Sequence, residues 1–159
     1  VKVYPVWNGG GTVRLAIVTS DWGVPSSTLI DTVQEIIDPI ENQGAGLGIA
    51  PIGHVVTVEG VTAATIDISS QITLQSGYTW ETVKPGIIAA ISEYFTDLIK
   101  AWEDTDNIVV RISQIETRTL VIPGVLDITG TKINGNASNL VLGPDEIPVL
   151  GDVTNETAD

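Results

Sequence analysis

Residues 62–74 show the plainest hydrophobic pattern in the chain, an alternation of apolar and polar positions. One side of this stretch carries Ala64, Ile66 and Ile68, and the other side carries Thr65, Asp67 and Ser69. A period of two is typical of a half-buried antiparallel strand. Residues 54–59, just before Gly60, are rich in Val and predict a second strand. We therefore expect residues 50–74 to form a ribbon around which the rest of the chain is organised.

Two segments have the spacing of amphipathic helices, one on each side of this ribbon. The first helix is predicted over residues 28–38, and Pro39 limits its extension. Its apolar stripe consists of Leu29, Ile30, Val33, Ile36, Ile37 and Ile40. Its polar residues, expected to face away from the core, are Asp31, Gln34, Glu35 and Asp38.

The second helix is predicted over residues 82–103, after an irregular turn. Its broad apolar stripe consists of Trp80, Val83, Ile87, Ile91, Tyr94, Phe95, Leu98 and Trp102. If Thr79 caps this helix instead of Thr82, Pro85 should kink it, because proline cannot donate a helical hydrogen bond.

The remaining segments predict short strands and one further helix. Residues 1–7 and 13–19 suggest a hairpin around a glycine-rich turn. Residues 108–122 fit either a strand or a helix, and we favour a short helix capped by Ser113. Short strands are predicted at residues 125–129, 132–133 and 139–142.

This order of elements indicates an α+β fold. We expect an antiparallel or mixed sheet with the two main helices on one face, in a split βαβ (ferredoxin-like) arrangement with flanking hairpins. The helices and the ribbon should then share one core. The predicted domain covers residues 1–142, including a small β subregion at residues 123–142. Residues 143–159 lack periodicity and are predicted to form an extended C-terminal tail.

Composition narrows the function classes. The 159 residues carry a formal net charge of −13, which argues against nucleic acid or an anionic membrane as a partner. The apolar runs are too short for membrane insertion, and the absence of Cys excludes disulfides and thiolate chemistry. The chain also lacks Met and begins at Val1, which we interpret as an excised part of a longer protein.

Candidate chemistry is sparse, and we predict no catalytic residue, no metal site and no cofactor. The glycines of residues 44–48 follow a helix and precede a strand, the reverse of the order in phosphate-binding loops. His54 is the only histidine and has no Cys to share a zinc ion. Residues 104–107 lack the Gly and Glu of a calcium loop. No pair among the acidic residues is marked out for glycoside hydrolysis.

Four tryptophans stand out in a chain with one Phe. Trp80 and Trp102 lie on the stripe of the second predicted helix and are expected in the core. Trp7 and Trp22 flank the first hairpin and are candidate exposed aromatics. They leave open an alternative function, a saccharide- or peptide-binding module.

Several stretches together resemble the C-terminal part of the baseplate protein J family of contractile-tailed phages and phage-tail-like particles. The resemblance is carried by VYPVWNGGGTVRLAIV at residues 3–18, APIG at 50–53, GYT at 77–79 with Val83 and Lys84, PGV at 123–125 with Asp127, ING at 133–135 with Asn139, and EIPVLG at 146–151. These stretches occur in the family's order and span nearly the whole chain.

The resemblance implies a structural, non-enzymatic role as a wedge-type baseplate subunit of a phage or prophage-derived particle. Its implied partners are other baseplate and tail-hub subunits and copies of itself. Its implied location is the baseplate of a virion or phage-tail-like particle, assembled in the cytoplasm of the bacterial host. Family members carry a longer N-terminal part, which agrees with the start at Val1.

The C-terminal tail is the predicted assembly interface. Its candidate residues are Glu146, Ile147, Pro148, Val149 and Leu150. Pro148 holds the chain extended and removes one backbone donor, which suits a segment that lies along a groove or a sheet edge. The alternative is that the segment covers an apolar seam on its own domain.

Overall fold

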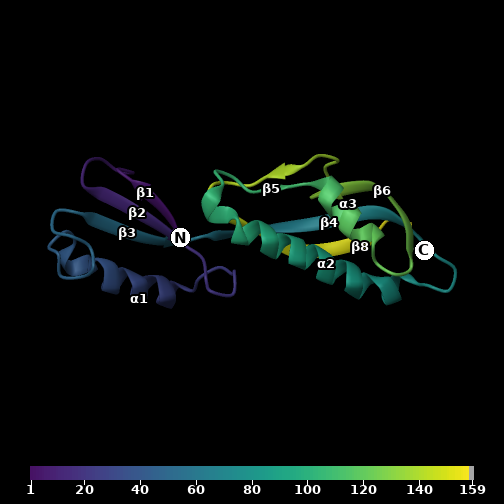
Figure 1. Cartoon of the computed structure of the whole chain (residues 1–159), viewed down its shortest axis with the longest axis horizontal. Helices are drawn as coiled ribbons and strands as arrows, with labels where there is room; N and C mark the ends of the chain where they lie inside the picture. The colour runs from purple at the N-terminus through teal and green to yellow at the C-terminus, as the bar shows by residue number, and fades with distance from the viewer. Residues whose placement is uncertain (158–159) are drawn as a thin grey trace. The chain divides into compact units, whose positions relative to one another are not determined.

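The computed structural model describes residues 1–157 and separates into two compact units, Val1–Thr62 and Ala63–Asp159. The predicted α+β class is confirmed, with helices and mixed sheets along the chain (Figure 1). The division falls within the predicted ribbon, between Thr62 and Ala63. The ribbon is therefore not a hairpin, and its two strands belong to different sheets.

The first unit is a three-stranded sheet with one helix. Strands β1 (Lys2–Pro5) and β2 (Thr12–Ile17) pair antiparallel, which confirms the predicted hairpin. Strand β3 (Val55–Gly60) pairs with β2 in parallel. Parallel neighbours need a crossover connection, and helix α1 (Ser27–Ile37) supplies it and contacts β3 (Figure 1). A short 3-10 helix, η1 (Ile40–Asn42), follows α1.

The second unit contains a second three-stranded sheet. Its central strand is β4 (Thr62–Leu74), with β6 (Val125–Ile133) antiparallel on one side and β8 (Glu146–Asn155) on the other. Contacts between β4 and β8 advance in the same direction, from Asp67 with Asp152 to Ser70 with Glu156, as in parallel strands. Strands β5 (Val109–Val110) and β7 (Leu140–Val141) form a separate pair.

Two helices cover one face of the β6–β4–β8 sheet. Helix α2 (Trp80–Lys100) contacts β8, helix α3 (Ile112–Leu120) contacts β6, and the two helices contact each other. A short 3-10 helix, η2 (Trp102–Asp104), follows α2. The alternation predicted for β4 is confirmed, because Ile66 and Ile68 are buried and Thr65 and Asp67 are exposed. The core of this unit includes Ile66, Ile68, Ile72, Val83, Ile87, Ile91, Phe95, Ile115, Ile133, Ile147 and Val153.

The structure differs from the predicted architecture in two ways. The helices do not lie on one common sheet, so the split βαβ arrangement is not confirmed, and each unit has its own core. Residues 143–159, predicted as an extended tail, include strand β8 of the second sheet. The apolar residues Ile147 and Val153 are buried there, because β8 covers part of the seam beneath α2.

Two helix starts also differ from the prediction. Helix α2 begins at Trp80, after Thr79, and includes Pro85. The Thr82 hydroxyl supports this start: it accepts a hydrogen bond from the Thr79 N–H at 3.0 Å and donates one to the Thr79 carbonyl at 2.7 Å. The third helix is present, but it follows Arg111 rather than Ser113. There the Ile112 N–H donates to the Asn139 side chain at 3.0 Å.

Replacing Phe95 of α2 with Ala should lower the free energy of unfolding of the second unit by about 2–5 kcal/mol, since the ring is buried and leaves a cavity. Chemical denaturation measures this loss. The exposed Glu93 on the same helix supplies a matched control, because Glu93→Ala should change stability by less than about 0.5 kcal/mol. Equal, small effects of both substitutions would show that this face of α2 is assigned wrongly.

Candidate interaction surfaces

Two polar side chains of α1 lie against the open edge of β3. Asp38, just after the helix, accepts a hydrogen bond from the Val56 N–H at 2.9 Å. Gln34 accepts one from the Val58 N–H at 2.8 Å and donates one to the Val56 carbonyl at 2.9 Å. These bonds take the place of a neighbouring strand, so part of this edge is closed to further pairing.

The predicted orientation of these two residues was wrong. Gln34 is 5% exposed and Asp38 is fully buried, whereas the helical pattern placed both on the solvent side. Helical periodicity assigns polar residues to water, but an edge strand supplies buried backbone groups that a polar side chain satisfies instead. Asp31 and Glu35 of the same set are exposed, as predicted.

Asp38 also positions the glycine-rich loop that follows η1. Its second carboxylate oxygen accepts a hydrogen bond from the Gly44 N–H at 3.0 Å. The loop then returns to the end of α1, where the Ile49 and Ala50 N–H groups donate to the Ile36 and Ile37 carbonyls. Gly48 permits this approach, since a Cβ there would lie 2.5 Å from the Ile37 carbonyl oxygen. Close backbone packing therefore accounts for glycine at this position.

This loop and the end of α1 present a group of exposed aliphatic side chains, here called the loop surface. Its members are Ile36, Ile40, Leu47, Ile49 and Ile52, with exposures between 54% and 79%. The Ile49 N–H donates to the Ile36 carbonyl, so this part of the loop lies beside the end of α1, and the Ile52 side chain lies against Gly46 of the same loop. Sequence patterns did not predict this surface, because they placed Ile36 and Ile40 on the apolar stripe of the first helix. The local signal was the presence of Leu47, Ile49 and Ile52 in a glycine-rich stretch, but their place beside α1 follows from long-range contacts.

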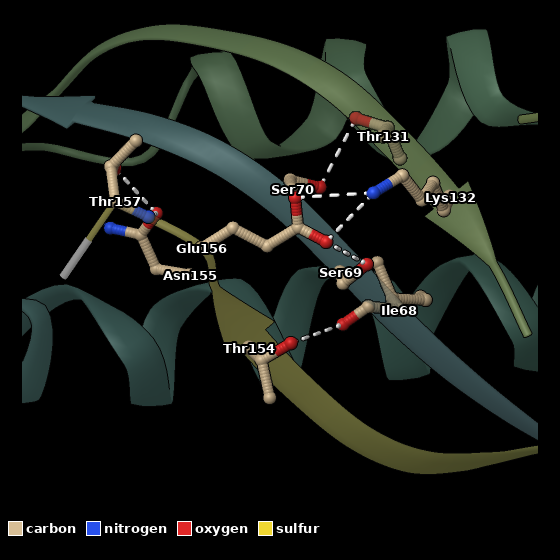
Figure 2. Close-up of polar contacts among 9 residues, drawn as sticks. All are labelled: Ile68, Ser69, Ser70, Thr131, Lys132, Thr154, Asn155, Glu156 and Thr157. Atoms are coloured by element: carbon tan, nitrogen blue, oxygen red, sulfur yellow. Dashed lines mark hydrogen bonds and ion pairs between the residues drawn. The ribbon is translucent and has the colours of Figure 1, made fainter. Parts of the chain in front are cut away.

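Polar side chains from β4, from β6 and from the residue just after β8 form a network on the second sheet (Figure 2). The Lys132 ammonium donates to the two Glu156 carboxylate oxygens at 3.0 and 3.3 Å, and the Ser69 hydroxyl donates to the same carboxylate at 2.9 Å. Lys132 and Ser69 together hold the pKa of Glu156 below its ordinary value. This network fastens the end of β8 to β4 and β6.

A second set of bonds fixes the C-terminal end of β8 and the residues just after it. The Asn155 side chain accepts from the Ile72 N–H at 2.9 Å and donates to the Ile72 carbonyl at 3.1 Å. The Thr157 hydroxyl donates to the same carbonyl at 2.9 Å. The side chains thus continue the pairing with β4 where the β8 backbone ends.

The predicted interface at residues 146–150 is divided between the core and the surface. Ile147 and Pro148 are buried, and the Glu146 carboxylate accepts a hydrogen bond from the Gly143 N–H at 2.7 Å. Val149 is exposed, and Leu150 is half-buried. Of these five residues, Val149 is the most exposed to solvent.

The tryptophans lie in different surroundings. Trp7 is 45% exposed at the β1–β2 turn, where the Arg14 guanidinium lies 6.0 Å from its ring. Trp22 is 37% exposed in the loop before α1. Trp102 is buried, as predicted, and its indole N–H donates to the Pro144 carbonyl at 2.8 Å. Trp80, also predicted in the core, is only half-buried.

Residues 1–157 contain no group of three or more His, Cys, Asp or Glu arranged to hold a metal ion. Within the same residues, each helix is too short or too polar to cross a lipid bilayer. His54 and Asp104 are both exposed.

Comparison with known proteins identifies two matched regions. Residues 1–60 match the Baseplate J-like central domain, and residues 66–156 match the Baseplate J-like protein C-terminal domain. Two proteins of Bacillus subtilis (strain 168) are similar over 96% of the chain: Phage-like element PBSX protein XkdT at 38% identity and Uncharacterized protein YqbT at 39%. The chain spans 42% of the length of each.

Replacing Gln34 or Asp38 with Ala should destabilise the first unit by about 1–3 kcal/mol per orphaned backbone group, since the Val56 and Val58 N–H groups lose their partners. Hydrogen exchange measured by NMR should show faster exchange at these two amides. Glu35→Ala, an exposed change on the same helix, should leave both rates unchanged. Unaltered protection in the Gln34 and Asp38 variants would contradict the role of these side chains.

The lowered pKa of Glu156 makes a small, pH-dependent contribution to stability. Because the folded pKa lies below the ordinary 4.5, this contribution is present above pH 4.5 and disappears as pH falls through the folded value. NMR titration of the carboxyl should show the shift, and Lys132→Ala should raise the pKa towards 4.5. Lys100→Ala, which removes a lysine beside Asp97 instead, should leave it unchanged. A Glu156 pKa insensitive to Lys132 would exclude this cause.

Proposed function

Because the chain belongs to the Baseplate J-like family, we propose that it is a structural part of a phage or prophage-derived baseplate. One observation carries the proposal. The two family matches, at residues 1–60 and 66–156, coincide with the two structural units, which divide between Thr62 and Ala63. Both units thus correspond to parts of one kind of protein, in the family's order of central and C-terminal domains.

The proposed role is that of a wedge-type subunit, which acts by binding other proteins around the tail hub. Its partners are baseplate and tail-hub subunits and further copies of itself. The similarity to a protein of a phage-like element supports a place in a tail particle. We place assembly of that particle in the cytoplasm of the bacterial host. The net charge of −13 disfavours nucleic acid and anionic membranes as partners.

We further propose that the chain acts without catalysis. The hydrogen bonds of its buried and networked polar side chains support the fold. Gln34 and Asp38 bond the backbone of β3, and Glu156 bonds side chains of β4 and β6. The loop surface exposes several aliphatic side chains to solvent, which suits a protein that binds other proteins. Val149, within the sequence-predicted interface, is a second proposed contact.

A saccharide- or peptide-binding module is the alternative function. It is favoured by the exposure of Trp7 and Trp22, since indole rings stack on sugars and on peptide side chains. Under this alternative, Trp7→Ala and Trp22→Ala would abolish ligand binding. The structural role requires instead that both variants still enter the particle.

Particle assembly tests the proposed function. The full-length gene should be disrupted in a bacterium that produces the particle, and the tails should be examined by electron microscopy. We expect tails without complete baseplates, since a missing structural subunit interrupts assembly. The wild-type gene should restore them, as should Glu93→Ala, which changes only an exposed side chain. Complete, functional baseplates that lack this protein, or turnover that depends on one of its acidic residues, would contradict the structural role.

A further inference from the structure

We propose that the loop surface docks onto a different baseplate protein, one that presents aliphatic side chains surrounded by Lys or Arg. This inference rests on the proposed function and extends it by naming a surface and the chemistry of its partner. The surface consists of Ile36, Ile40, Leu47, Ile49 and Ile52.

The side chains of the loop surface are strongly exposed. All five residues are aliphatic, lie within residues 36–52 and are more than half exposed. Scattered apolar residues are normal on a protein surface, but a local group of this kind marks a site of protein contact. Burial of such side chains against a partner would remove a large apolar area from water, which favours association.

The loop that carries this surface is ordered by its own hydrogen bonds. The loop does not depend on a partner for its conformation, because Asp38 holds Gly44 and the Ile36 and Ile37 carbonyls hold Ile49 and Ala50. A surface that is already ordered loses little conformational entropy on binding. The buried Asp38 carboxylate therefore helps to order the loop surface although Asp38 is not one of its residues.

Charge identifies the kind of partner. The exposed Glu35 and Glu41 directly adjoin Ile36 and Ile40 of this surface, and the sequence has no Lys or Arg between Arg14 and Lys84. Within the first unit, Lys2 is buried and Arg14 pairs with Glu59 at 2.8 Å. Acidic residues beside an apolar group are complemented by basic residues on the partner.

The same charges disfavour a second copy of this surface as the partner. A symmetric contact would bring the acidic residues of both copies into the same interface, and like charges there oppose association. Anionic lipid and nucleic acid are disfavoured for the same electrostatic reason. A basic protein surface remains the occupant to which the chemistry points.

Site-specific photo-crosslinking in assembled particles tests this inference. A photoreactive amino acid should replace Leu47 in the full-length protein, and Val141, an exposed aliphatic residue of β7, should be replaced in a parallel control. Mass spectrometry then identifies the crosslinked peptides. We expect Leu47 to give a crosslink to a different baseplate protein, at a peptide that contains Lys or Arg.

Binding of that protein, purified, should then be compared among variants of the full-length chain. The double variant Leu47→Ser, Ile52→Ser should weaken binding at least about tenfold, the scale expected when central interface side chains are truncated. Glu35→Lys with Glu41→Lys should slow association at low salt. Val141→Ser should bind normally, and melting temperatures should show that all variants are folded.

The outcomes separate this inference from the proposed function. If the protein is present in the particle but Leu47 crosslinks only to another copy, or to nothing, the inference fails and the structural role stands. Unchanged binding by the double variant also overturns the inference. If the protein is absent from complete particles, the proposed function fails and this inference fails with it.

Discussion

The hydrogen bonds between the β3 backbone and the side chains of Gln34 and Asp38 are the interactions on which the first unit depends. A three-stranded sheet with a parallel pair is small, and β3 lies at its edge. Without partners, the Val56 and Val58 backbone groups beneath α1 would be buried and unsatisfied, which is costly in an apolar environment. Two side chains solve this problem and simultaneously fix α1 against the sheet. The same carboxylate orders the glycine-rich loop, so the edge of the sheet and the exposed loop surface share one anchor.

The second unit uses side chains for a similar purpose at the end of β8. Asn155 and Thr157 bind both backbone groups of Ile72, and Glu156 reaches Ser69 on β4 and Lys132 on β6. The ion pair is solvent-exposed, so its geometry matters more than its energy. Burial of Ile147 and Val153 supplies the main attachment of β8, and the polar network sets its register.

Sequence patterns predicted those elements whose burial follows simple periodicity. The alternation in β4 and the stripe of α2 were both found, because each element has one buried and one exposed face. Gln34 and Asp38 were misplaced because periodicity cannot show that a polar side chain meets a strand edge. Strand β8 was missed for a different reason: Pro148 and Gly151 interrupt its pattern, and its pairing with β4 is distant in sequence. The loop surface depends on how residues 43–53 return to α1, which only long-range contacts determine.

A structural subunit needs surfaces that resist the wrong contacts as well as surfaces that favour the right ones. In this protein, side chains close part of the β3 edge, and the outer face of the second sheet presents polar and charged groups such as Asp67 and Lys132. The closed edge opposes unspecific strand pairing, and the polar groups on the sheet face oppose unspecific apolar contact. The aliphatic loop surface stands in contrast to them, and it is held rigid by its own hydrogen bonds. An exposed apolar surface that is rigid, together with a sheet edge that is closed to other strands, is the combination expected where binding must be specific. The apolar surface can then bind its partner while unwanted strand pairing is opposed.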